Sequence, residues 1–397
     1  MRSLFRYLGP GLITAALVFG PGSLTITSKL GSLYAYQHIW VILQAVVFML
    51  SYTEMGARIG MATSDSLLCS IQQKWGKAAS VILGLGIFAI TASFQAGNTI
   101  GASLAFAKLA GSGTEGWVIA FTLAGISLLF FRSFYKVLEK VMISLVALML
   151  LSFLITLILA RPDFGALASG LIPSLPAGSE MLSVALIASS FSVVGAFYQG
   201  YLVQEKGWTK AEASQGRKEA MAGVLVLGLI SLFILTNAAS ILYPQGIQVN
   251  SATDMGLALE PLYGNTATVI FMLGLFGASF SSLIGNATIG GSLLADAFSL
   301  GNALSSPKVR MLIMLVMLIG AAIALRFGRL PLELIVFAQA ITVVIAPLVG
   351  LAILVLANDR ERMGELKNTI THNIFAILGL LLLLGLSATQ LYLQFIR

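Results

Sequence analysis

Residues 17–27 read Leu-Val-Phe-Gly-Pro-Gly-Ser-Leu-Thr-Ile-Thr, and they interrupt an apolar run that is otherwise long enough for a helix. Pro21 removes a backbone donor and clashes with the preceding turn, while Gly20 and Gly22 tolerate unwound backbone. Unwound backbone at membrane depth persists only where protein buries it or where it lines a watery cavity. With Ser23 following, the stretch predicts a broken helix at a binding site, and the alternative is a simple proline kink.

The composition indicates that a bilayer, not water, surrounds most of the chain. Of the 397 residues, 58% are hydrophobic and 10% are charged, whereas soluble domains carry about 25% charged residues. Long apolar stretches recur along the whole length, which is typical of a membrane protein. The first stretch begins near Gly9 without a cleavage-site pattern, so we expect no removed signal peptide.

The apolar stretches predict an all-α integral membrane protein of about eleven transmembrane helices, since each crossing needs about 20 residues. No soluble domain fits between the stretches, so residues 1–397 form one predicted transmembrane domain. The predicted spans are 9–34, 38–58, 79–109, 114–131, 135–160, 181–204, 219–243, 266–296, 309–326, 331–357 and 370–395.

The distribution of basic residues predicts the orientation, because cytoplasmic loops are enriched in Lys and Arg. With the N-terminus inside, most of the 23 basic residues fall in inner loops. We therefore expect a multi-pass protein of the cytoplasmic membrane with its C-terminus outside. The basic residues left on the outer side are Lys29, Lys108, Arg161, Arg326, Arg329 and Arg397.

Several classes of function are disfavoured by the residues present. The net charge of +7 sits in short loops that set orientation, so we expect no nucleic-acid partner. The single cysteine, Cys69, and the two distant histidines, His38 and His372, predict no Cys- or His-based metal cluster and no cofactor. No catalytic arrangement of residues is evident at membrane depth, which argues against an enzyme. The oligomeric state is not predicted.

A secondary transporter with two inverted repeats would place a second break in the sixth span. That span carries Ser189, Ser190, Ser192 and Gly195 at mid-membrane depth but no proline, so ordinary small-residue helix packing is an equal alternative. On this scheme the first repeat covers about 9–160, the second about 181–357, and an extra helix covers about 370–395.

Several segments, in order, resemble the NRAMP family of transporters. The Gly20–Ser23 break is similar to that family's D-P-G-N motif in helix one, and residues 54–63 (EMGARIGMAT) to the end of helix two. Residues 277–291 resemble helix eight, and Phe337–Ala340 with Pro347 resemble helix ten. The resemblance implies a LeuT-type fold of five-plus-five inverted repeats, with helices one and six broken, and proton-coupled transport of divalent metal ions.

The chain departs from the family at the residues that hold the metal. Gly20 stands at the Asp position of D-P-G-N and Ser23 at the Asn position, while Ser192 to Val194 replace the M-P-H stretch of helix six. Gln199 stands where a second His is usual, and Gln339 is retained. Because a desolvated dication needs carboxylate or soft sulfur ligands, we do not expect high-affinity manganese or iron transport.

The predicted site is therefore neutral, with no set of metal ligands. Its lining would suit a zwitterion, a polar molecule or an anion, and hydrated magnesium is a further alternative. A sensor or channel on the same fold, without transport, also stays open. The predicted substrate-binding residues are Gly20, Pro21, Gly22, Ser23, Ser192, Val193, Gly195, Gln199 and Gln339.

Overall fold

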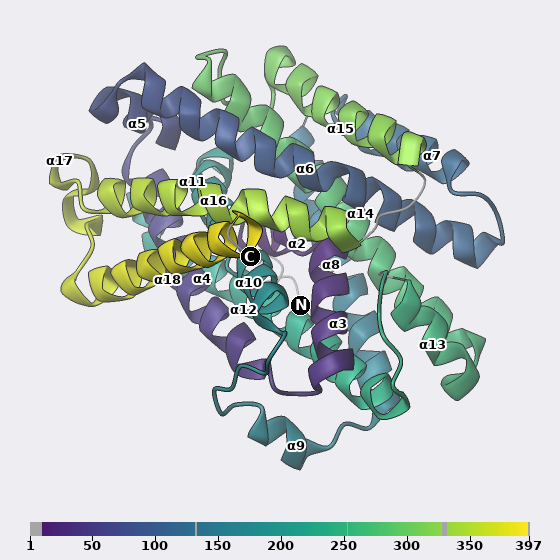
Figure 1. Cartoon of the computed structure of the whole chain (residues 1–397). Helices are drawn as coiled ribbons and strands as arrows, with labels where there is room; N and C mark the ends of the chain where they lie inside the picture. The colour runs from purple at the N-terminus through teal and green to yellow at the C-terminus, as the bar shows by residue number, and fades with distance from the viewer. Residues whose placement is uncertain (1–9, 132, 252, 328–331, 396–397) are drawn as a thin grey trace.

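The structure is a computed structural model that describes residues 10–131, 133–251, 253–327 and 332–395. Throughout these residues the regular structure is helical (Figure 1). The α-helices are α2 (Pro10–Val18), α3 (Pro21–Tyr34), α4 (Ile39–Ala62), α5 (Leu67–Trp75), α6 (Lys77–Ala110), α7 (Glu115–Leu128), α8 (Phe134–Ala160), α9 (Phe164–Ser169), α10 (Glu180–Ser190), α11 (Val193–Glu205), α12 (Ala213–Ile241), α13 (Asp254–Tyr263), α14 (Asn265–Ala297), α15 (Pro307–Phe327), α16 (Leu332–Ala357), α17 (Arg360–Met363) and α18 (Ile370–Phe395).

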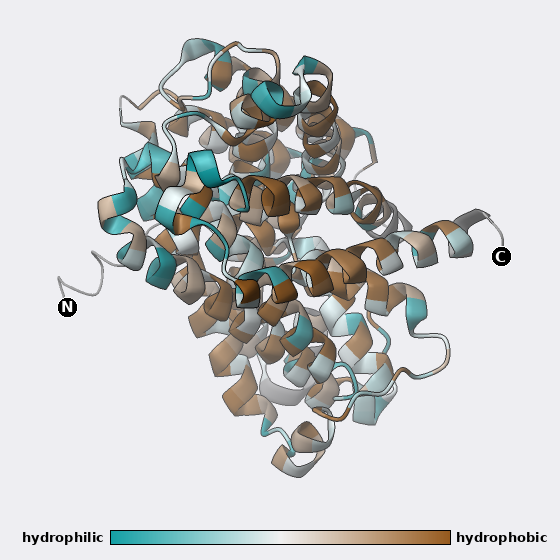
Figure 2. Cartoon of the chain, turned by 90° about the vertical axis from the view of Figure 1, so that its left-hand side faces the viewer, coloured by the Kyte–Doolittle hydropathy of each residue, from teal (hydrophilic) through white to brown (hydrophobic). Residues whose placement is uncertain are grey.

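The helices agree with the predicted spans. In the described part of the chain, 9 helices are long and apolar enough to cross a membrane, and the bent pair α2 and α3 makes a tenth. The predicted span 114–131 corresponds to α7, whose 14 residues are short for a full crossing. Figure 2 shows hydrophobic residues along the helices and hydrophilic ones mainly at helix ends and loops. The first residues of the predicted spans 9–34 and 331–357 lie outside the described residues.

The same sequence of a short helix followed by a long helix occurs twice in the chain, which supports the inverted repeat. A short helix precedes the long helix α6, and another precedes the long helix α14; these are α5 and α13. Each short helix ends at a glycine with nearly the same backbone angles, φ 84° and ψ 167° at Gly76 and φ 79° and ψ 171° at Gly264. A positive φ of this kind favours glycine. The two long helices α6 and α14 then pack along each other.

Close backbone contact positions the first half-helix. A Cβ atom on Gly11 of α2 would lie 1.8 Å from the carbonyl oxygen of Glu219, and one on Gly223 of α12 would lie 1.9 Å from that of Gly11. No other residue fits such a crossing, and small residues commonly bring membrane helices this close. This close backbone contact holds α2 against α12 and therefore positions the break between α2 and α3 along the bundle.

Two contacts join segments that are predicted to lie on the same side of the membrane. Lys74 Nζ lies 2.8 Å from a carboxylate oxygen of Asp359, and both residues are on the predicted inner side. Lys29 Nζ donates to Asn250 Oδ1 at 3.3 Å, and both are on the predicted outer side. The contacts agree with the predicted loop pattern, while the side that faces the cytoplasm stays a prediction. Five basic residues used for that prediction lie outside the described residues: Arg2, Arg6, Arg132, Arg329 and Arg397.

Candidate functional site

The first break lies where the sequence predicts it. Helix α2 ends at Val18, α3 begins at Pro21, and the two helices are bent by 65°. Gly20 has extended backbone, with φ −111° and ψ −177°, and Pro21 occupies the first helical position. Proline fits this position because its missing N–H would have no helical partner. The predicted broken first span is therefore confirmed.

The second break separates α10 from α11 at Phe191 and Ser192. Ser192 has φ −80° and ψ 91°, and its Oγ accepts a hydrogen bond from the Gly195 amide at 3.2 Å. The serine side chain therefore replaces a helical backbone bond, and the helix restarts without a proline. The two segments together form a single span, Glu180–Glu205.

A small cavity of about 50 Å³ lies between the two breaks. A single water needs roughly 10–15 Å³ on the same scale, so the cavity holds a small solute or a few waters. Helices α2, α3, α6, α10, α11, α14 and α16 surround it. The lining residues are Leu17, Val18, Gly20, Gly22, Ser23, Ile90, Phe94, Asn98, Ala188, Ser189, Ser192, Val194, Asn286, Ile289, Gln339 and Thr342.

The polar lining is uncharged among the described residues. It consists of serine, threonine, asparagine and glutamine side chains, and the described lining includes no Asp, Glu, Lys, Arg, His or Cys. Across the described residues no group of three or more His, Cys, Asp or Glu side chains is placed to hold a metal ion. Neutral oxygens alone are poor ligands for a transition-metal ion that must leave its water shell.

Five of the predicted site residues line the cavity: Gly20, Gly22, Ser23, Ser192 and Gln339. The other four lie nearby in packing positions. Gln199 Oε1 accepts a hydrogen bond from Thr14 Oγ1, which ties α11 to α2. The role of all nine residues in substrate binding stays a prediction.

Close packing explains the positions of Pro21, Val193 and Gly195, which flank the breaks. A Cβ atom on Gly195 would lie 2.6 Å from Val18 Cγ2, and one on Gly101 would lie 2.7 Å from Pro21 Cβ. Val193 is 1% exposed and belongs to the hydrophobic core. These residues hold the half-helices against their neighbours.

Four polar lining residues, Asn98, Ser189, Asn286 and Thr342, are not among the nine predicted substrate-binding residues. Ser189 Oγ donates to the Leu186 carbonyl and Thr342 Oγ1 to the Ala338 carbonyl, each within its own helix. Thr342 stands three residues after Gln339 on α16, so helical spacing from a predicted residue is the signal that could have found it. Ser189 lies on α10, before the break at Phe191 and Ser192, and helical spacing does not connect it to Ser192.

The polar lining residues differ in whether they have hydrogen-bond partners. Asn98 Nδ2 donates to the Ser282 carbonyl at 3.2 Å, across from α6 to α14. The side chains of Ser23, Asn286 and Gln339 make no hydrogen bond with any described residue. Gln339 is only 3% exposed, and its Oε1 is buried without a partner. These three groups, on α3, α14 and α16, are free to bond a solute.

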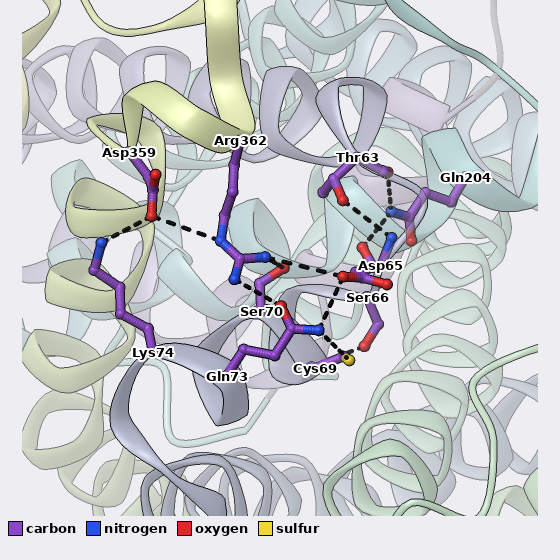
Figure 3. Close-up of polar contacts among 10 residues, drawn as sticks. All are labelled: Thr63, Asp65, Ser66, Cys69, Ser70, Gln73, Lys74, Gln204, Asp359 and Arg362. Atoms are coloured by element: carbon purple, nitrogen blue, oxygen red, sulfur yellow. Dashed lines mark hydrogen bonds and ion pairs between the residues drawn. The ribbon is translucent and has the colours of Figure 1, made fainter.

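Two groups of paired charged residues, together called the inner network, lie on the predicted inner side. Arg362 donates to Gln73 Oε1 at 2.6 Å and lies 3.6 Å from Asp359, which also pairs with Lys74 (Figure 3). Hydrogen bonding to Lys74 holds the pKa of the Asp359 carboxyl below its usual value. The charged members of the network are Glu54, Arg58, Asp65, Lys74, Arg217, Asp359 and Arg362.

Glu54 is the most buried acid of the inner network. The predicted pair with Arg58, one turn along α4, is present at 3.7 Å. A shorter contact of 3.0 Å joins Glu54 to Arg217 on α12, and His372 of α18 lies 3.5 Å away. Arg58 donates to the carbonyl of Leu366 at 2.7 Å. Glu54 thus connects three helices, which sequence spacing alone does not indicate.

A family model described as natural resistance-associated macrophage protein-like matches residues 11–393. The chain belongs to the NRAMP family. The predicted resemblance is therefore confirmed, and with it the prediction of a membrane transporter that is not an enzyme. The divalent metal cation transporter MntH of Caldanaerobacter subterraneus subsp. tengcongensis is 26% identical, over 99% of this chain and 94% of its own length.

Solved structures show that this NRAMP-family chain has the predicted LeuT-type fold. The manganese transporter of Eremococcus coleocola superposes with a TM-score of 0.79 at 17% identity, covering 98% of this chain and 87% of its own. MhsT, solved with L-phenylalanine, gives a TM-score of 0.61 at 14% identity, covering 95% and 98%. These likenesses establish the architecture.

Proposed function

We propose that this NRAMP-family chain is a secondary transporter whose central cavity binds a small hydrogen-bonding solute, not a bare transition-metal dication. The observation that carries the proposal is the uncharged lining: Ser23, Asn286 and Gln339 offer unpaired polar groups, and no described residue of the lining is ionisable. Hydrogen bonds to a solute would compensate these groups for the water that burial removes.

The physical argument against a bare dication is its desolvation. A dication that enters a low-dielectric cavity loses much hydration energy, and proteins repay this loss with carboxylates or sulfur ligands. Gly20 and Ser23 supply neither, and the described lining has no substitute for them.

Uptake into proteoliposomes tests the proposal, with manganese, magnesium, amino acids and small anions compared side by side. We expect saturable uptake of a non-metal solute and none of manganese. Gln339→Leu should abolish that uptake, whereas Gln37→Leu, at an exposed glutamine, should leave it unchanged. Saturable manganese uptake that a chelator abolishes would overturn the proposal.

A second candidate is transport of a divalent metal that keeps much of its water shell. The observation that favours it is the name of the relatives: MntH proteins that are 25–26% identical over nearly the whole chain are described as divalent metal cation transporters. Magnesium retains its waters readily, and neutral amides can bond them. Magnesium uptake without solute uptake in the same assay would favour this candidate, and solute binding without uptake would indicate a sensor.

We also propose the predicted topology: N-terminus inside, C-terminus outside, with repeats at about 9–160 and 181–357 and the extra helix at 370–395. The two loop contacts support it. Single cysteines placed by Glu365→Cys and Ser174→Cys in a Cys69→Ser background test the sidedness. An impermeant thiol reagent should label only Cys introduced at 174 in intact cells, and the reverse pattern would invert the topology.

A further inference from the structure

The amino end of α3 is buried at the cavity and has no cap. Its N-cap residue is Gly20, which makes no side-chain hydrogen bond. The first backbone amide of α3 that makes a helical hydrogen bond is that of Leu24, which donates to the Gly20 carbonyl at 3.1 Å. The amides of Gly22 and Ser23, two residues that line the cavity, have no hydrogen bond with the described residues. Buried, uncapped amides at a helix start call for a ligand or water.

The carboxyl end of α2, across the same break, is capped. Ser281 Oγ donates to the Ala16 carbonyl at 3.0 Å, and Ser282 Oγ approaches the Ala16 and Leu17 carbonyls at 3.3 and 3.4 Å. The break therefore has uncapped amides at its positive end, whereas side chains already bond the Ala16 and Leu17 carbonyls at its negative end. The start of α11 is also partly satisfied, because Ser192 caps it.

Gln339 provides an independent sign of a ligand at the same place. This side chain is 3% exposed, lines the cavity from α16, and bonds to no described residue. Asn286 lines another wall, on α14, and is likewise unpaired among the described residues. Each amide group offers two N–H donors. The buried atom of Gln339 without a partner is the acceptor Oε1, while the N–H groups of both amides bond to no described residue and can donate to a ligand. Unpaired polar groups thus line the cavity from α3, α14 and α16.

We propose that the solute presents a carboxylate or another small oxyanion to the uncapped amino end of α3, with the Gln339 amide donating to it from α16. This inference rests on the proposed function and narrows its substrate class. A helix start favours negative charge through its free amides and its dipole. Among the residues that the structure describes, the lining supplies no carboxylate that would compete for these donors. The volume of about 50 Å³ limits the solute to the size of acetate, nitrate or glycine.

Binding of these three probes to the purified full-length protein, measured by titration calorimetry, tests the proposal; urea and glycerol serve as neutral probes. Ser23→Asp places a carboxylate at the α3 start, and Ser23→Asn is its uncharged match. We expect Ser23→Asp to weaken oxyanion binding by about tenfold or more relative to Ser23→Asn, since a charge there competes for the same amides.

A second pair of variants tests the proposal independently, in case the Ser23 variants do not fold. Gln339→Glu keeps the shape of the side chain and adds a negative charge, while Gln339→Met removes only the amide. We expect Gln339→Glu to weaken oxyanion binding more than Gln339→Met does. A melting temperature close to that of the wild type verifies that each variant is folded.

The outcomes separate this inference from the proposed function. Binding of acetate, nitrate or glycine that both acidic variants weaken supports the inference, and binding of glycine alone assigns a zwitterion. Urea or glycerol binding without any oxyanion binding, or oxyanion binding that neither acidic variant changes, overturns the inference and leaves the proposed function standing. Manganese binding by the wild type in place of every solute overturns both.

Discussion

The central cavity and the inner network treat polar groups in opposite ways. In the inner network each charged side chain has an oppositely charged partner within 4.0 Å, as Asp359 has in Lys74 and Arg362. In the cavity the polar side chains are uncharged, and Ser23, Asn286 and Gln339 lack partners among the described residues. The difference teaches that this chain keeps its ion pairs at the helix ends and leaves the membrane centre to hydrogen bonds.

The contrast follows from the cost of burial. A charge at the centre of a bilayer is expensive unless it is paired, whereas an unpaired amide or hydroxyl costs less and can be satisfied by a bound solute. Paired charges at the membrane edge connect helices, whereas unpaired neutral groups at the centre can bind a ligand. Variants of the inner network test the first role, and variants of the cavity test the second.

Removal of the buried acid should have the largest effect. Glu54→Leu leaves Arg58, which is 6% exposed, without its carboxylate. Breaking a buried pair by deleting one partner costs about 3–5 kcal/mol. We therefore expect a large drop in the melting temperature of the purified protein.

The exposed partner of Glu54 provides the control for this variant. The side chain of Arg217 is 53% exposed, and surface ion pairs contribute at most about 1 kcal/mol. Arg217→Met should therefore lower the melting temperature far less than Glu54→Leu. Equal losses would show that burial does not decide the strength of the inner network.

A carboxylate placed in the cavity should allow it to bind a metal ion. Gly20→Asp with Ser23→Asn puts a charge and an amide at the first break. A Cβ atom on Gly20 would lie 2.8 Å from Asn98 Oδ1, a side-chain atom that can shift. Because attraction between a carboxylate and a dication there reaches several kcal/mol, we expect manganese binding to tighten by about a hundredfold or more, measured by calorimetry.

Ser23→Asn alone is the control for the added charge, since it lacks the carboxylate. It should bind manganese as poorly as the wild type. A double variant that binds no more tightly than this control would mean that the cavity differs from a metal site by more than two side chains.

Loss of the second cap should have a smaller effect. Ser192→Ala removes the side-chain oxygen that accepts from the Gly195 amide. N-cap serines contribute about 1 kcal/mol, so a modest drop in melting temperature is expected. Ser189→Ala, which removes a hydroxyl bonded within its own helix, is the matched control. The capping role is wrong if both variants lose equal stability.

The membrane helices and the first break could be predicted from sequence because their signals are local. Apolar length fixes a span, and Gly20-Pro21-Gly22 breaks a helix wherever it occurs. The second break had only a weak signal, since a serine cap at Ser192 resembles any polar residue in a packed helix. The sequence therefore predicts the fold class, whereas the position of the second break is seen only in the structure.

The cavity lining was harder to predict because it depends on side-chain direction. Gln199 and Ser192 are seven residues apart on one span, yet Gln199 turns to Thr14 while Ser192 faces the cavity. The contact of Glu54 with Arg217 joins two helices far apart in sequence. No spacing rule predicts such contacts, since they follow from how the helices pack.

The smallest expected effect concerns pH and the edge of the inner network. Lys74 lowers the pKa of Asp359, so the carboxylate stabilises the fold above the ordinary pKa of an aspartate. This contribution is lost as the pH falls through the lowered pKa. Asp359→Asn should thus lower the melting temperature slightly at about pH 7 and by a smaller amount at about pH 3, which lies below the ordinary pKa of an aspartate; both changes are small because solvent-exposed pairs are worth less than about 1 kcal/mol. A loss that is independent of pH would show that Asp359 acts through shape and not through charge.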